Sequence, residues 1–507
     1  MTSTFHGIET SKRGLMTQTT ALNTTGHNIS NANTAGYTRQ VVNMSASSPM
    51  EAYGLSRSTS TGQIGTGVEA TSIKRIRDTF LDSQYRSENS ALGSWDIQYS
   101  NLDKIQTIMN EPSDTGLQTV LDNFWNAWSD FSNDPNNTTN RNIIKQTTLA
   151  LTDSLNNIST KLSQLDTDLS SSVTLKATEA NGYLSQIAEL NGSIKKIEGL
   201  GDDANDLRDK RDYYVDQLSK LGNVSITEQA DGYEVTFGGQ VLVTGQTVNS
   251  EVSLQTLQDA YNGGTLSSGE FNGLFKSKAY VTDYQTQMNQ LANTIANGDV
   301  EVTIPSGSVL PEGTVLNGVT YSDANGNRTL SSDLTVTVQG INGLHKLGYN
   351  LSGQAGGNIF VASDGGTLTA ANITLSTDIQ NDSSLIASSM RLSGGTVVSG
   401  NNSLALLMEN LKYAKFSVSS TNSTTINDYL SATMGQLGVQ TEDAQRELEN
   451  SQTLVDQVDS SRQSVSGVSL DEEMSNLIKF QQAYSASARF MTTYDEILDK
   501  LINGTAV

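Results

Sequence analysis

Residues 470–502, LDEEMSNLIKFQQAYSASARFMTTYDEILDKLI, decide the fold of this chain. Apolar side chains recur in this stretch at alternating intervals of four and three residues, and neither proline nor glycine interrupts it. A heptad repeat on a long helix indicates a coiled-coil seam with another helix. The repeat passes through Leu470, Met474, Leu477, Gln481, Tyr484, Ala488, Met491, Asp495, Leu498 and Ile502. The rest of the chain must therefore supply a helical partner.

A second heptad pattern lies near the N-terminus. It consists of apolar residues at intervals of seven, namely Ile8, Leu15, Leu22 and Ile29. Taken alone, this segment is equally consistent with an amphipathic helix packed on a local domain. The heptad helix at the other end of the chain favours pairing between the two chain ends. We call the two sets of heptad positions together the predicted seam.

Polar residues in the predicted seam have an expected role. A polar side chain in a coiled-coil seam lowers stability but restricts register and partner choice. We therefore expect Gln481 and Asp495 to set the register between subunits, and Gly26 to let the two backbones approach closely.

Composition excludes several classes of function. The chain has 507 residues, a net charge of -23 and no cysteine. Such an acidic chain is not expected to bind nucleic acid or an anionic membrane surface. Without cysteine there is no disulfide, thiolate metal site or cysteine nucleophile. No run of 18 apolar residues predicts a membrane span, and residues 1–29 lack the apolar region of a cleaved signal peptide.

The middle of the chain predicts a mainly α, multi-domain α+β fold with β insertions. Helical periodicity dominates from about residue 77 to 221, and alternation over 224–243 predicts a β-hairpin that turns at Asp231 and Gly232. We expect a terminal coiled-coil domain, a long-helix bundle domain and an outer β-rich domain inserted in the middle of the chain. The expected bounds are 1–42 with 467–507, 43–297 with 401–466, and 298–400.

Candidate sites for chemistry are weak. Asp202, Asp203, Asp206 and Asp209 lie close in sequence, but the interleaved Lys and Arg residues favour a solvated, salt-bridged helix over a metal site. Residues 323–327, DANGN, lack the glutamate that a calcium loop needs at its twelfth position, so we predict a turn. No histidine stands in a catalytic motif. We therefore expect no catalytic residue, cofactor or metal.

Two strings at opposite ends of the chain carry a family resemblance. Residues 21–40, ALNTTGHNISNANTAGYTRQ, resemble the N-terminal signature of bacterial flagellar axial proteins, and residues 476–484, NLIKFQQAY, resemble the matching C-terminal signature. Residues 204–212, ANDLRDKRD, and 341–349, INGLHKLGY, are similar to the FlgK type of hook-associated protein. The motif residues are Asn28, Asn31, Asn33, Gly36, Tyr37, Asn205, Asp206, Asp209, Arg211 and Asp212.

The resemblance implies a structural protein of the flagellum that joins the hook to the flagellin filament. It implies assembly through the terminal helices, which we expect to be largely disordered in the free subunit. The implied partners are further copies of the chain, the hook protein, a second hook–filament junction protein and an export chaperone that binds the C-terminal region. The implied location is the extracellular flagellum, reached by type III export without a cleaved signal peptide.

Two alternatives remain open. The first is the flagellar hook protein or another axial component, which shares the terminal signatures but should lack the long helical region. The second, from another class, is a secreted adhesin or glycan-binding protein that uses residues 298–400. An enzyme has little support, because no spacing singles out a catalytic pair among the 54 acidic residues.

Overall fold

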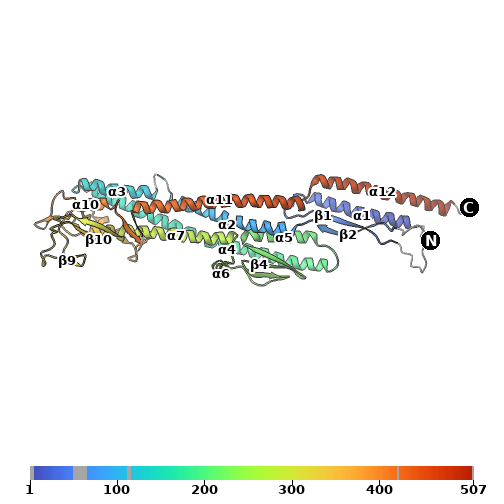
Figure 1. The fold of residues 1–507 in the computed structure, drawn as a ribbon, viewed down its shortest axis with the longest axis horizontal. Helices are drawn as coiled ribbons and strands as arrows, with labels where there is room; N and C mark the ends of the chain where they lie inside the picture. The colour runs from blue at the N-terminus through green and yellow to red at the C-terminus, as the bar shows by residue number, and fades with distance from the viewer. Residues whose placement is uncertain (1–4, 50–64, 111–112, 114–115, 420–421, 505–507) are drawn as a thin grey trace. The chain divides into compact units, whose positions relative to one another are not determined.

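The structure, a computed structural model, describes residues 5–49, 65–110, 113, 116–419 and 422–504. It is mainly helical with small sheets, as predicted (Figure 1). The helices are α1 (His6–Ser30), α2 (Thr79–Met109), α3 (Leu117–Asn133), α4 (Thr138–Glu198), α5 (Asn205–Leu221), α6 (Leu254–Asn262), α7 (Glu270–Asn297), α8 (Gly340–His345), α9 (Thr377–Asn381), α10 (Ser403–Asn410), α11 (Ile426–Ser466) and α12 (Leu470–Asn503), with a 3-10 turn, η1 (Ser383–Leu385).

The strands are short and pair antiparallel. They are β1 (Gln40–Ala46), β2 (Val68–Arg75), β3 (Val224–Gln229), β4 (Gly232–Phe237), β5 (Gln240–Thr244), β6 (Thr247–Val248), β7 (Asp299–Ile304), β8 (Thr314–Leu316), β9 (Val319–Tyr321), β10 (Leu334–Gln339), β11 (Phe360–Ala362), β12 (Ile373–Leu375), β13 (Leu392–Ser393), β14 (Thr396–Val397), β15 (Phe416–Ser419) and β16 (Asn422–Thr424). Two sheets have four strands, in the orders β3-β4-β5-β6 and β10-β7-β15-β16, and the other strands form two-stranded pairs.

The chain forms two compact units. Unit 1 comprises Met1–Trp95, Val173–Gly273 and Leu448–Val507, and unit 2 comprises Asp96–Ser172 and Leu274–Glu447. The long helices α2, α4 and α11 each contribute residues to both units. The sequence predicted three domains with other bounds, and that division stays a prediction.

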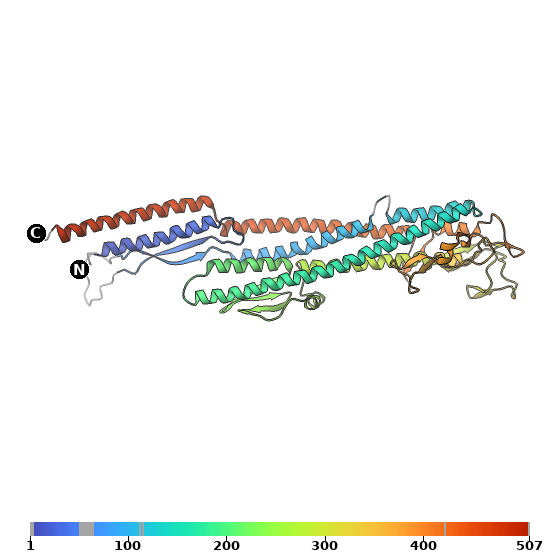
Figure 2. The ribbon, with the colours of Figure 1, turned by 180° about the vertical axis from the view of Figure 1, so that it is seen from behind.

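In unit 1, the two terminal helices pack against each other. Figures 1 and 2 show α12 beside α1, with the β1–β2 ribbon next to α1. The hydroxyl of Thr17 on α1 donates a hydrogen bond of 3.2 Å to the carbonyl oxygen of Val68 on β2. Pairing of the two chain ends, as the heptads predicted, is thus present. The supercoiled geometry of a coiled coil remains a prediction.

The predicted β-hairpin is also in unit 1. β3 and β4 pair in register from Val224 opposite Phe237 to Gln229 opposite Gly232. Gly232 has a φ of 125°, a conformation that favours glycine and closes the tight turn. Alternate residues Tyr233, Val235 and Phe237 of β4 are buried, as the period of two requires.

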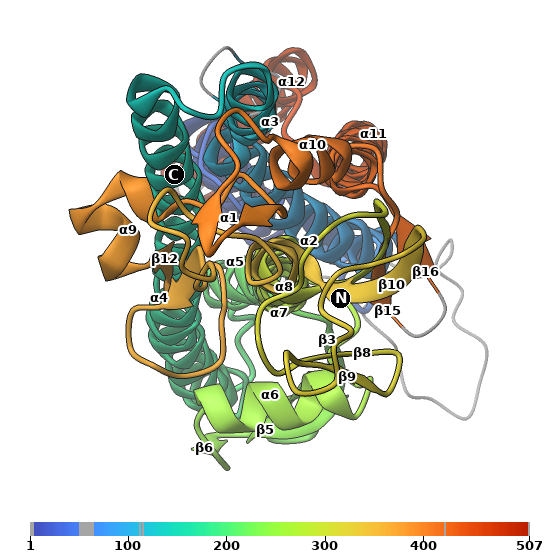
Figure 3. The ribbon, with the colours of Figure 1, turned by 90° about the vertical axis from the view of Figure 1, so that its left-hand side faces the viewer.

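Unit 2 has an aromatic core on α3. Phe124, Trp125, Trp128 and Phe131 recur at helical spacing and are all buried. Figure 3 shows α10 beside α3, and Glu409 of α10 accepts hydrogen bonds from two serines of α3. The sheet of this unit combines β7 and β10 with β15 and β16, so it extends beyond the expected 298–400 insertion.

The 323–327 loop in unit 2 carries its own counter-ion. The guanidinium of Arg328 lies 2.7 Å from the carboxylate of Asp323 and 3.5 Å from that of Glu312. The loop is thus a turn closed by an ion pair, in which Arg328 supplies the positive charge opposite Asp323.

His345, at the end of α8, is a fully buried structural histidine. Its Nδ1 lies 2.7 Å from the carbonyl oxygen of Gly357, and its Nε2 accepts the backbone N–H of Ala387 at 2.8 Å. These contacts require the neutral ring with the proton on Nδ1. Burial lowers the pKa of His345 from 6.5 to about 4.

We predict that unit 2 loses stability in mild acid. The neutral form of His345 stabilises the folded state above pH 6.5, and this contribution is lost as the pH falls through about 4. His345→Gln should therefore reduce the slope of unfolding free energy against pH in this window, while costing about 1–3 kcal/mol at pH 7 through two weakened hydrogen bonds. Urea unfolding in a Trp95→Phe background, followed by fluorescence of Trp125 and Trp128, measures both quantities.

The matched control for this prediction is His6→Gln, because His6 lies in unit 1. It should leave the pH dependence of the Trp125 and Trp128 signal unchanged. An unaltered slope in the His345 variant would contradict the assignment.

Candidate functional site at the junction of the terminal helices

Small residues of α1 face α12. A methyl group placed on Gly7 would overlap the ring of Tyr494, and one placed on Gly14 would lie 3.0 Å from the hydroxyl oxygen of Ser487. At the other end of α1, the amide of Asn28 donates to the carboxylate of Glu473 at 3.0 Å. The residue numbers in each of these three pairs add up to 501. The helices are therefore antiparallel, in one continuous register.

On α1 this contact face lies one residue away from the predicted seam, and on α12 it coincides with only part of the predicted seam. On α1, Ile8, Leu15, Leu22 and Ile29 are half-buried, whereas Gly7, Gly14, Ala21 and Asn28 are buried. On α12, Leu498 is buried, while Leu477, Ala488 and Met491 are half-buried. The remaining predicted positions are exposed, namely Leu470, Met474, Gln481, Tyr484, Asp495 and Ile502.

One expectation about this face needs correction. Gly26 has open space around it, so the close approach occurs at Gly7 and Gly14 instead. Gln481 and Asp495 are exposed in the single chain, and their expected role in setting the register between subunits stays a prediction. The role of the predicted seam in assembly stays a prediction.

A buried carboxylate holds the start of α12. Glu473 is 2% exposed, and its second oxygen lies 2.7 Å from Nε of Arg39. Arg39 also contacts Glu472 at 2.9 Å, and its backbone N–H donates to the carbonyl oxygen of Ser466 at the end of α11. The hydroxyl of Ser469 caps α12. We call Glu473, Asn28 and Arg39 the Glu473 contact.

Asn28 is the centre of the N-terminal motif. Its side-chain oxygen accepts the Tyr37 hydroxyl at 2.8 Å and the Gln40 N–H at 3.0 Å, while its nitrogen donates to the Gln40 carbonyl and to Glu473. All four hydrogen-bonding positions of this buried amide are thus used. Gly36 closes the turn with a φ of 78°, where any Cβ would lie 2.9 Å from Tyr213.

The other two motif asparagines have smaller roles. Asn31 ends α1, and its side chain donates to the carbonyl oxygen of His27 at 3.0 Å. Asn33 is exposed in the turn. Of the motif asparagines, Asn28 alone reaches α12 through a hydrogen bond among the described residues.

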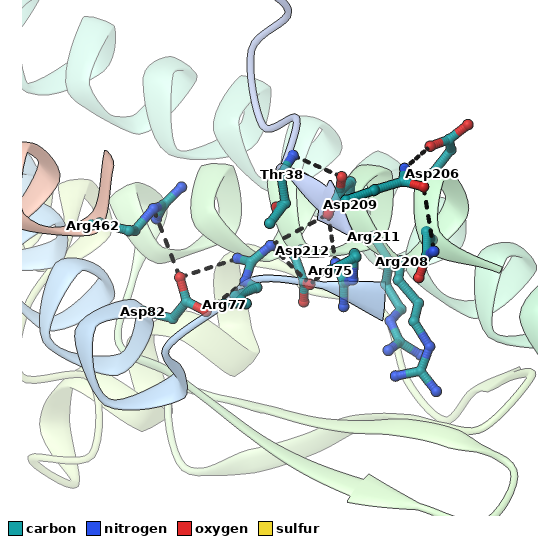
Figure 4. Close-up of polar contacts among 12 residues, drawn as sticks. Thr38, Arg75, Arg77, Asp82, Asp206, Arg208, Asp209, Arg211, Asp212 and Arg462 are labelled. Atoms are coloured by element: carbon teal, nitrogen blue, oxygen red, sulfur yellow. Dashed lines mark hydrogen bonds and ion pairs between the residues drawn. The ribbon is translucent and has the colours of Figure 1, made fainter. Parts of the chain in front are cut away.

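A second buried group, part of which is shown in Figure 4, fastens α5 to its neighbours in unit 1. Asp209 accepts the Thr38 N–H at 2.8 Å, and Arg75 bridges Asp209 and Asp212 at 2.6 and 2.9 Å. Further ion pairs join Arg77, Arg86 and Arg462 to Asp82, Asp212 and Asp216. We call this group the charge cluster: Asp82, Asp209, Asp212 and Asp216 with Arg75, Arg77, Arg86 and Arg462.

The charges of the cluster balance one another. Burial alone would raise the pKa of Asp212, but Arg77, Arg75, Arg86 and Arg211 lower it to about 2. For Asp209, burial outweighs the attraction of Arg75, and its pKa is raised. The cluster joins β2, α2, α5 and α11 of unit 1 through charged side chains that lie out of water.

The structure corrects the interpretation of residues 204–212 as a solvated helix. Asp209, Arg211 and Asp212 are buried, and their partners come from distant segments rather than from Lys210 of the same helix. Arg211 lies over the ring of Tyr233 at 3.3 Å and donates to Asn191. The remaining motif residues lie at the edge of the cluster, where Asn205 donates to Ile73 and exposed Asp206 accepts from Gln40.

Sequence reasoning missed Glu473 and the four arginines of the charge cluster. A signal for Glu473 existed, because Gly7, Gly14, Ala21 and Asn28 recur at intervals of seven and mark a small-residue face. No spacing in the sequence pointed to the arginines, which lie in three separate segments. A count of apolar residues alone favoured the adjacent face of each helix.

The hollow beside this junction offers no built cofactor site. It measures about 650 Å³ and is lined by residues of the 32–39 turn and the 464–469 linker. Its arginines, Arg39, Arg77 and Arg462, already pair with carboxylates. Within the described part of the chain, no three or more His, Asp or Glu residues are grouped so as to hold a metal. None of the helices searched there is long and apolar enough to span a membrane.

We predict that Asp212→Ala destabilises unit 1 by about 3–5 kcal/mol, because it leaves buried arginines without their counter-charge. Asp203→Ala is the control: Asp203 is exposed in the loop before the same helix and should change stability by no more than about 0.5 kcal/mol. Urea unfolding, with hydrogen–deuterium exchange of α5 peptides, measures the difference. Equal effects of the two substitutions would contradict a structural role for the cluster.

Family models of flagellar proteins match the helical region and both ends of this chain. The family model of the flagellar hook-associated protein FlgK helical domain matches residues 102–298. The flagella basal body rod protein model matches residues 8–38, and the flagellar basal body rod FlgEFG protein C-terminal model matches residues 459–504. Asn28 lies within the match over residues 8–38, and Glu473 lies within the match over residues 459–504. Arg39, the third residue of the Glu473 contact, follows directly after residue 38.

Relatives match nearly the whole chain, and a solved structure matches about three quarters of it. Flagellar hook-associated protein 1 of Escherichia coli (strain K12) is 26% identical over 98% of this chain and 99% of that protein. The flagellar hook junction protein FlgK from Burkholderia pseudomallei has a similar fold, with a TM-score of 0.52 and 14% identity over 76% of this chain and 100% of that one. Flagellar hook-associated protein 1 of Bacillus subtilis (strain 168) is 33% identical over 100% of this chain and 99% of its own length, and the chain therefore belongs to the flagellar hook-associated protein 1 (FlgK) family.

Proposed function

We propose that this chain is a structural component of the bacterial flagellum that joins the hook to the flagellin filament and assembles through its two terminal helices. The observation that carries the proposal is the uncovered apolar surface of α12. Large exposed apolar side chains follow this helix from end to end, namely Leu470, Met474, Ile478, Tyr484, Phe490, Ile497, Leu501 and Ile502. Such a surface on a soluble subunit marks an interaction site.

The proposed mechanism is burial rather than chemistry. α1 covers one side of α12 and leaves apolar flanks that neighbouring copies would cover in a tubular assembly. Ile8, Leu15, Leu22 and Ile29 on α1, half-buried in one chain, would complete such contacts. Ordering the termini costs about 1–2 kcal/mol per residue, which the burial offsets. Disorder of the terminal helices in the free subunit stays a prediction, whereas the contacts between α1 and α12 favour a helix pair that forms within one chain.

The proposed partners follow from the same surface. Besides copies of the chain, they are the hook protein on one side and a second hook–filament junction protein on the other. The apolar flank of α12 would be exposed to water before assembly. This exposure supports the proposal that an export chaperone binds the C-terminal region. The proposed location is the extracellular flagellum, reached by flagellar export without a cleaved signal peptide. The relatives are named flagellar hook-associated protein 1, and we propose no catalytic activity or cofactor for this chain.

Two rival functions are distinguishable. The hook protein or another axial component would share the terminal matches, but the helical-domain match over residues 102–298 supports the hook-associated role. A secreted adhesin or glycan-binding protein would use residues 298–400. Electron microscopy of labelled flagella distinguishes these functions, because a junction protein would form a single band where the hook meets the filament.

Removal of residues 468–507 should abolish incorporation at the hook tip, because it deletes α12 and Glu473 together. Unit 2 should keep its cooperative unfolding, since this deletion removes none of its residues. Incorporation onto isolated hooks, counted by immuno-electron microscopy, and thermal unfolding of the purified chain measure the two effects. A truncated chain that still binds hook tips would refute assembly through α12.

Leu477→Asp should reduce incorporation at hook tips far more than Gln482→Asp. Leu477 is half-buried and belongs to both the predicted seam and the observed face, whereas Gln482 is exposed on the same helix. Both substitutions add one negative charge, so the pair controls for charge. Asp203→Ala serves as a second control outside the helix pair. If Gln482→Asp were the more damaging change, apolar contact along this face would not drive assembly.

A further inference from the structure

α12 carries two overlapping heptad faces, and only one of them packs on α1. Both faces include the heptad positions Leu477, Met491 and Leu498, together with Tyr484, whose side chain stays 40% exposed. The face observed against α1 adds Glu473, Phe480, Ser487 and Tyr494, whereas the predicted seam adds Met474, Gln481, Ala488 and Asp495. Each additional set contains two polar residues. Apolar burial therefore does not explain which face turns toward α1.

The small residues of α1 do not make the choice either. Gly7, Gly14 and Ala21 present little side chain, so they accept a large or a small residue of α12 with equal ease. A ring lies against Gly7 and a serine against Gly14. Positions as small as these have low selectivity for the face that docks on them.

The two faces differ in the partners that they find at the end of α1. Glu473 receives a hydrogen bond from Asn28 at 3.0 Å and an ion pair from Arg39 at 2.7 Å. A turn of α12 by one residue, about 100°, would carry this carboxylate out of the interface. It would leave the buried Asn28 amide without its fourth partner, and Asp495 would replace Tyr494 opposite Gly7. Buried polar groups that lose a partner are costly.

Asn28 is held by contacts that do not involve α12. Tyr37 and Gln40 hold its side-chain oxygen, so its nitrogen points to one place. Arg39 lies between them in sequence, and its backbone is bonded to the end of α11. The turn after α1 thus forms a preorganised receptor for one carboxylate, and a receptor of this kind selects by position.

We infer that Glu473 selects the face of α12 that packs on α1, with Asn28 and Arg39 as the positioning residues that receive it. The N-terminal signature and the first turn of α12 are then two halves of one contact. Its consequence, which rests on the proposed function, is that Leu470, Met474 and Ile478 remain free for a neighbouring copy. The face selection itself is a property of the single chain and holds whether or not the chain assembles.

Disulfide trapping in the full-length chain tests this inference, because the sequence contains no cysteine. In Gly14→Cys with Ser487→Cys, the two Cβ atoms would lie about 3.5 Å apart, at the short end of disulfide geometry. Gly14→Cys with Ala488→Cys reports the face turned by one residue. In the parent chain the first pair should oxidise much faster than the second. Glu473→Leu should change the ratio of the two rates by at least about tenfold toward the second pair.

A single-cysteine readout accompanies the trapping. Met474→Cys should be alkylated quickly in the parent, since Met474 is 49% exposed, and at least about tenfold more slowly with Glu473→Leu, which turns residue 474 toward α1. Gln482→Leu, an exposed apolar change on the same helix, is the matched control and should alter neither readout. Glu473→Gln should fall between parent and leucine variant, because it keeps an acceptor but loses the charge.

Three outcomes would overturn the inference. An unchanged ratio with Glu473→Leu would mean that packing alone chooses the face. Loss of both disulfides would mean that Glu473 is required for pairing rather than for its orientation. Disulfides that join two chains on a non-reducing gel would mean that α12 packs on another copy. Failure of the proposed assembly would appear only in the hook-tip experiments and leave these readouts intact.

Discussion

The buried carboxylate of Glu473 is the constraint on which the junction of the two chain ends depends. It is the one charged side chain that the described part of α12 places out of water, and Asn28 and Arg39 both turn to it. Asn28 in turn organises the 31–40 turn, which delivers Thr38 to Asp209 and so meets the charge cluster. A continuous set of polar contacts thus leads from the start of α12 to α5 within unit 1.

This arrangement separates cohesion from orientation. Apolar contacts along α1 and α12 are compatible with more than one face, and their contribution is non-directional. Charged and amide groups at one end supply the direction, because their partners occupy fixed positions. The charge cluster follows the same logic on α5, where Asp209, Asp212 and Asp216 share one helix face and are met by arginines from three other segments. In both places the charges are balanced, which limits the cost of their burial.

Much of the architecture was predictable from the sequence, and the limits have physical causes. Heptad spacing predicted two long terminal helices that pair, and alternation with Asp231 and Gly232 predicted the hairpin, because both signals are local. The contact face was missed by one residue because apolar counting discounts a glutamate and a glycine. The burial of Asp209 and Asp212 was missed because their partners, Arg75 and Arg77, lie far away in sequence, and nothing in residues 204–212 encodes that distance.

The glycine face of α1 has a mechanical consequence. The helix pair is clamped at the Glu473 end, while Gly14 and Gly7 further along offer a smooth track to Ser487 and Tyr494. Interlocked side chains would resist axial displacement, but side chains that rest on bare backbone slide with little repacking. When such a pair bends, one helix slides along the other, and the displacement between them grows with distance from the Glu473 end. The junction is thus stiff where its orientation is set and compliant where the chain ends.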